Sequence, residues 1–98
     1  MSRIELAPEV GGDLDRILDH LVRYDAANAA SRIRETIRAI DVLEQNSLIG
    51  RPVHADKREL VIGRRERGYV VLYRYVVEID TVLVLALRSQ REAGYTRT

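Results

Sequence analysis

The chain contains no cysteine, phenylalanine or tryptophan, and only one lysine among its 98 residues. The lack of cysteine excludes disulfides and thiolate zinc sites, so the fold needs no oxidising compartment. The core must be aliphatic, with five tyrosines as the only aromatic residues. Charged residues interrupt every apolar run before it reaches the about 20 residues of a membrane-spanning helix. The first ten residues contain no apolar stretch of signal-peptide length, so we expect a cytoplasmic protein with no part in a membrane.

The composition that remains is typical of a folded domain. Hydrophobic residues make up 46% of the chain, and 98 residues leave no room for a second core, so we expect one domain over residues 1–98. Residues 1–49 hold six arginines against nine acids, whereas residues 50–98 hold ten basic residues against six acids. The resulting balances of −3 and +4 predict that the second half meets a nucleic acid or an acidic protein segment. A solvated, arginine-rich surface would show the same balance.

The first half of the chain predicts a strand followed by two helices. Residues 3–7 alternate between apolar and polar side chains, which is typical of a short strand. Pro8 suits the first turn of a helix, and apolar residues three and four positions apart follow over residues 10–22. The acids of this helix, Asp13 among them, fall mostly off the apolar stripe.

A break at Tyr24 and Asp25 precedes the second helix, which is rich in alanine and isoleucine over residues 26–43. Its apolar stripe includes Ile37, which we expect in the core, where an aspartate would unfold the protein. Two helices joined by a tight link form a hairpin, and a hairpin with one apolar side needs a sheet to cover.

The second half predicts a turn over residues 48–52, where glycine and proline lie close together, and then three strands. These strands cover residues 58–62, 69–77 and 81–88. Both faces of the last two strands carry apolar residues, so we expect them to be central and covered on both sides. The predicted order is strand, helix, helix, strand, strand, strand. The fold class is therefore α+β: an antiparallel sheet of about four strands with a helical hairpin on one face.

Several kinds of site are unsupported by the sequence. His20 and His54 have no third ligand nearby, so we expect no metal site. The serines have no histidine and acid partners at the spacing of a hydrolase triad. The glycines do not form a phosphate-binding loop. We expect no cofactor.

Arginines are the side chains that point to a function. Arg58, Arg74 and Arg88 come from three strands of the predicted sheet, and we expect them to form one surface that holds phosphate or carboxylate. Tyr95 could donate or accept a proton there if the positive field lowered its pKa. The competing interpretation is structural: Arg74 pairs with Glu59 or Glu78, and Tyr95 only covers the core.

The order and spacing of several short motifs resemble the RelE/ParE superfamily of toxins from bacterial type II toxin–antitoxin systems. The resemblance covers nearly the whole chain. It includes the opening strand followed by proline, the alanine-rich helix, and the segments 48–52, 58–60, 68–74 and 87–95. It implies a small growth inhibitor that forms a hetero-oligomer with a cognate antitoxin.

The resemblance implies two candidate targets. Members like RelE cleave mRNA on the ribosome without metal; here Arg88, Arg91 and Tyr95 match their basic and tyrosyl positions, with Lys57, Arg58 and Arg64 in support. Members like ParE poison DNA gyrase and are not nucleases. We favour ParE, because the two long helices and the turn over residues 49–52 are closer to that branch. The assisting lysines of the nuclease branch are reduced here to Lys57, and arginine does not replace lysine as a proton donor. A non-toxic regulatory member is a further alternative.

Overall fold

The computed structural model describes residues 1–63, 68–92 and 94–95. Short 3₁₀ turns over Ala26–Asn28, Val42–Glu44 and Val77–Ile79 connect some of the longer elements. The longer elements are β1 (Arg3–Leu6), α1 (Val10–Tyr24), α2 (Ala29–Asp41), β2 (Arg51–Pro52), β3 (Lys57–Ile62), β4 (Tyr69–Val76) and β5 (Thr81–Ser89). In the described part of the chain, neither helix combines the length and apolar character needed to cross a membrane.

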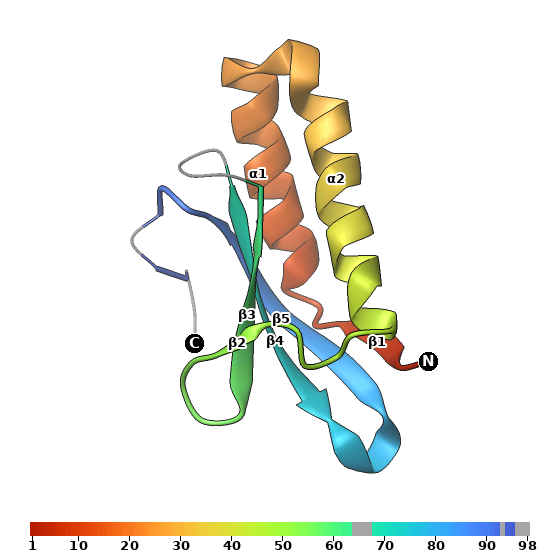
Figure 1. Cartoon of the computed structure of the whole chain (residues 1–98). Coiled ribbons are helices and arrows are strands. Elements are labelled where there is room, and N and C mark those ends of the chain that lie inside the picture. Colours follow the sequence, from red (N-terminus) through yellow and green to blue (C-terminus); the bar gives the residue numbers. More distant parts are fainter. Residues whose placement is uncertain (64–67, 93, 96–98) are drawn as a thin grey trace.

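Figure 1 shows the two helices side by side as a hairpin that lies along the sheet. The strand order is β1-β5-β4-β3-β2, with β1 parallel to β5 and every other pair antiparallel. The predicted α+β class and helical hairpin are therefore confirmed. The strand count differs, because two residues of the predicted turn, Arg51 and Pro52, pair with β3 as a fifth strand.

The second helix faces the core with different residues from those expected. Ala29, Thr36 and Ile40 are buried, whereas Ile37 is 47% exposed. The expectation that Ile37 lies in the core is therefore wrong. Each helical residue turns the side-chain direction by about 100°, so the step from Thr36 to Ile37 leads away from the buried face. An aspartate at position 37 would reach water and would not be a buried charge.

Strands β4 and β5 lie inside the sheet and are buried on both faces, as predicted. Val71 and Val84 belong to the core cluster shared with the helices. Val70, Leu72 and Ala86 alternate with the core positions and point to the opposite face, yet each is at most 3% exposed. The face turned away from the helices, which we call the open face, is therefore also covered.

The loop before β2 is fixed by a close contact with the core. The Gly50 N–H donates to the hydroxyl of the fully buried Tyr73 at 2.8 Å. A Cβ atom on Gly50 would lie 2.7 Å from a ring carbon of Tyr73 and 2.9 Å from the carbonyl oxygen of Glu59. Only glycine fits this position without displacing the ring or β3.

We expect Gly50→Ala to destabilise the fold by about 1–3 kcal/mol, because the added methyl group overpacks a site with no free space. Gly11→Ala is the matched control: nothing lies within 4 Å of a Cβ there, and alanine in a helix is favoured over glycine by about 0.5–1 kcal/mol. Urea unfolding of both variants measures the difference. Equal stability of the two variants would show that the Gly50 contact is not tight.

Candidate functional site

The alternation of side chains along β3 decides which predicted site residues meet. Arg58 is paired with Tyr73 of the core cluster, so it lies on the helix side of the sheet. Its guanidinium donates to the carbonyl oxygens of Leu48 at 3.1 Å and Gly50 at 2.8 Å. The expectation that Arg58 shares a surface with Arg74 and Arg88 is therefore wrong, because the period of two along a strand sends Arg58 to the other face.

Glu59 points to the open face and is the centre of the site. Its neighbour in register is Leu72, and its side chain is only 10% exposed. Its Oε1 accepts from Arg51 Nη2 at 2.9 Å and from Arg51 Nε at 3.3 Å. Its Oε2 accepts the hydroxyl proton of Tyr95 at 2.6 Å. This single carboxylate therefore joins β3, β2 and the segment that follows β5.

Arg88 and Tyr95 are brought together on the open face. The guanidinium carbon of Arg88 lies 5.1 Å from the centre of the Tyr95 ring, which is cation–π distance. Because Tyr95 contacts Arg88 of β5 and Glu59 of β3, it crosses β4 between them. In Figure 1 the segment after β5 turns back toward β3.

The protonation of this pair is set by their contact. Burial, followed by the hydrogen bond to Glu59, raises the pKa of Tyr95 well above its ordinary value, and the nearby Arg88 only partly offsets this. The condition under which Tyr95 could move a proton, a pKa lowered by the positive field, is therefore not met. Burial acts to raise the pKa of Glu59, but the hydrogen bonds from Tyr95 and Arg51 outweigh it, and the pKa is lowered. At neutral pH the site is therefore a neutral phenol donating to a carboxylate.

The remaining predicted site residues lie elsewhere. Arg74 pairs with Asp56 at 2.9 Å, and its neighbour in register on the open face is Lys57. Arg91 is exposed and lines a cleft of about 540 Å³ whose walls include α1. Arg64 lies outside the described residues. In residues 1–63, 68–92 and 94–95, no three histidine, cysteine or acidic side chains gather where they could hold a metal ion.

A second polar cluster anchors the chain between β5 and Tyr95. The buried Asp13 accepts the backbone N–H of Leu87 at 3.0 Å and a donor of Arg16 at 3.1 Å. Arg16 also binds Glu92 at 3.0 Å. The sequence pattern predicts that the acids of α1, Asp13 among them, lie mostly off the apolar stripe. Asp13 is buried because β1 pairs with β5 only as far as Val84, which leaves the Leu87 N–H for a side chain.

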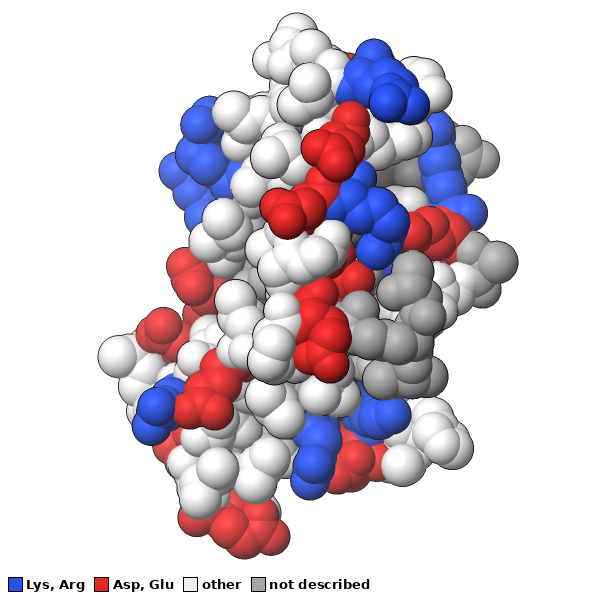
Figure 2. Space-filling view, turned by 180° about the vertical axis from the view of Figure 1, so that it is seen from behind, with Lys and Arg blue, Asp and Glu red and all other residues white. Residues whose placement is uncertain are grey.

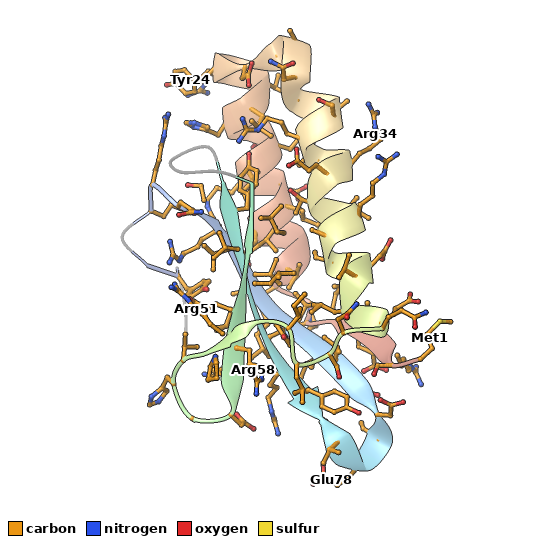
Figure 3. All side chains as sticks on the ribbon, in the orientation of Figure 1. Met1, Tyr24, Arg34, Arg51, Arg58 and Glu78 are labelled. Atoms are coloured by element: carbon orange, nitrogen blue, oxygen red, sulfur yellow. The ribbon has the colours of Figure 1, made fainter. Side chains whose placement is uncertain are left out.

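Sequence reasoning missed the central role of Glu59, which it considered only as a partner for Arg74. Figure 3 labels Arg51 and Arg58, which come from the neighbouring strands β2 and β3. The alternation of Arg58, Leu60 and Ile62 with Glu59 was a usable signal, since two apolar residues mark the side that faces the core. Nothing local in the sequence indicates the contact with Tyr95, 36 residues away.

We expect Glu59→Gln to lower stability at neutral pH and to have less effect as the solution becomes acidic. A lowered pKa means that the carboxylate contributes stability above its ordinary value of 4.5, and that this contribution is lost as pH falls through the folded-state pKa. Urea unfolding of both proteins at neutral pH and well below pH 4.5 measures the gap. A gap that stays constant with pH would contradict the assignment.

Comparison with known proteins identifies the family. Residues 4–94 match the family described as the ParE toxin of the type II toxin–antitoxin system parDE. Toxin RelE3 of Caulobacter vibrioides is 29% identical over 92 residues, which cover 94% of this chain and 98% of that protein. The structure of the chromosomal ParDE system from P. aeruginosa matches with a TM-score of 0.77 at 22% identity, over 91% of this chain and 96% of that one. Because the family match spans nearly the whole sequence, the chain belongs to the ParE toxin family of type II toxin–antitoxin systems.

Proposed function

We propose that this toxin arrests growth by binding and poisoning DNA gyrase, and that a cognate antitoxin neutralises it in a cytoplasmic complex. Membership of the ParE family supports the choice of gyrase as target. The hydrogen bonds that occupy Glu59 on the open face support action through protein binding. The observation that carries most weight is the hydrogen bond of 2.6 Å from Tyr95 to Glu59.

Metal-free RNA cleavage needs a group that moves a proton and cations free to stabilise a developing negative charge. The hydroxyl proton of Tyr95 is already donated to Glu59, and its raised pKa keeps the phenol protonated at neutral pH, so no phenolate is available as a base. Arg51 is committed to the same carboxylate through two nitrogens. These residues are therefore arranged as a closed unit, which is poorly suited to attack on a phosphodiester.

One observation favours the alternative, a ribonuclease acting on mRNA at the ribosome. Arg88 and Tyr95, two of the residues expected in such a site, do contact each other. The third, Arg91, lines the cleft beside α1 instead. Lys57, the lysine expected to support such a site, is the neighbour of Arg74 in register, and Arg74 forms an ion pair with Asp56. We therefore rank the nuclease second.

The antitoxin is the expected main partner under this proposal. The solved ParDE system with the same fold supports a hetero-oligomer of toxin and antitoxin. Figure 2 shows acidic and basic side chains interspersed on the side of the molecule seen from behind. The charge difference between the two halves of the sequence therefore does not give a continuous basic stripe on that face. Such mixed charge suits a protein partner better than a nucleic-acid backbone.

A supercoiling assay with purified gyrase, relaxed plasmid and the toxin tests the proposal. We expect loss of supercoiling and accumulation of cleaved DNA complexes, both reversed by the antitoxin. Tyr95→Phe should keep most of this activity, since the phenol has no chemical role in it. Gyrase activity unchanged by a folded toxin that still arrests growth would contradict the proposal.

Two controls separate the alternatives. RNA cleavage by the purified protein that survives EDTA and disappears in Tyr95→Phe would establish the nuclease instead. Expression of the chain alone in a bacterium tests the non-toxic alternative, for which growth would continue.

A further inference from the structure

We propose that Glu59 fills an anion-binding site formed by Arg51, Arg88 and Tyr95, and that its carboxylate prevents the open face from binding the phosphates of a nucleic acid. This makes Glu59 a specificity-determining residue. The inference concerns what the open face rejects. It does not depend on which cellular target the toxin has.

The first argument is that the donors around Glu59 suit any small oxyanion. Arg51 presents Nε and Nη2 to one oxygen, and the hydroxyl of Tyr95 binds the other at 2.6 Å. A guanidinium fork and a phenol bind phosphate oxygens in the same way as carboxylate oxygens. The site therefore has the chemistry of an anion receptor whose ligand is part of the chain.

The second argument is that the positive charge of Arg88 lies beside the occupied site. Its guanidinium donates to the carbonyl oxygens of Ser89 at 3.2 Å and Glu92 at 3.3 Å, and it also acts on the Tyr95 hydroxyl by hydrogen bonding and charge. Its Nε is buried and has no hydrogen-bond partner in the described part of the chain. Its charge acts on Glu59 from nearby and helps to lower the pKa of that carboxyl.

The third argument is that an incoming phosphate would compete with Glu59 for the same donors. Two unit negative charges within contact distance repel each other, and the effect grows as the setting becomes less exposed to water. The side chain of Glu59 is 10% exposed and is held in place by Arg51 and Tyr95, so it cannot swing away without losing these bonds. With Glu59 neutral, Arg51 and Arg88 would face a phosphate without an opposing charge, and Lys57 lies two residues along the same strand face.

The test compares RNA binding by the wild type and two variants, Glu59→Gln and Glu59→Ala. The probe is a fluorescein-labelled single-stranded RNA oligonucleotide, and its affinity is followed by fluorescence anisotropy at low ionic strength. Glutamine keeps the shape and a hydrogen bond from Arg51, whereas alanine also opens space. We expect roughly tenfold tighter binding by each variant, with a steeper dependence on salt.

The matched control is Glu78→Gln, which changes the net charge by the same amount. Figure 3 labels Glu78 at the tip of the β4–β5 hairpin, well away from Arg51. We expect this variant to bind RNA as weakly as the wild type. Adding Arg51→Ala to Glu59→Gln should remove most of the gain in affinity, because the double variant lacks the Arg51 guanidinium that would bind the phosphate.

Circular dichroism confirms that each variant is folded before binding is measured. The proposal is overturned if folded Glu59→Gln and Glu59→Ala bind RNA no more tightly than Glu78→Gln. It is also overturned if the wild type already binds as tightly as the variants, or if the gain survives Arg51→Ala. None of these outcomes involves gyrase, so failure here and failure of the proposed target are separate results.

Discussion

The arrangement of the open face depends on one buried carboxylate and the donors that satisfy it. Taking a carboxylate out of water costs free energy unless it is paired and hydrogen-bonded. Glu59 meets this requirement through Arg51 and Tyr95, which belong to β2 and to the segment after β5. The carboxylate therefore brings the far end of the chain back across the sheet. The tyrosine that it holds contacts β3 and β5, the two strands on either side of β4.

The sheet makes this possible because its central strands are apolar on both sides. The helical hairpin covers one face, and the aliphatic core contains no aromatic residue except tyrosine. On the other face, Tyr95 lies against Glu59 of β3 and Arg88 of β5. The same alternation that sends Glu59 to the open face sends Arg58 to the helix side, where it binds loop carbonyls. Neighbouring residues in β3 thus serve different ends: one anchors a loop and the other closes a site.

The sequence was sufficient for the elements with strong local patterns. The helical hairpin and the three strands of the second half follow from apolar periodicity, and the family follows from motif order. Features set by distant contacts were not predictable: the pairing of Arg51 and Pro52 with β3, the burial of Asp13, and the contact between Glu59 and Tyr95. Two misses had a local signal. Strand alternation separates Arg58 from Arg74, and helical rotation separates Ile37 from Thr36.

The most direct test of this account is the titration of the Tyr95 phenol. Selective carbon labelling of tyrosine, with the signal assigned from Tyr95→Phe, allows its pKa to be followed by NMR as pH rises. The account predicts that Tyr95 titrates well above its ordinary value of 10.0 in the wild type and at lower pH in Glu59→Gln. A wild-type pKa at or below 10.0 would mean that the phenol does not donate to Glu59 and that the site is open.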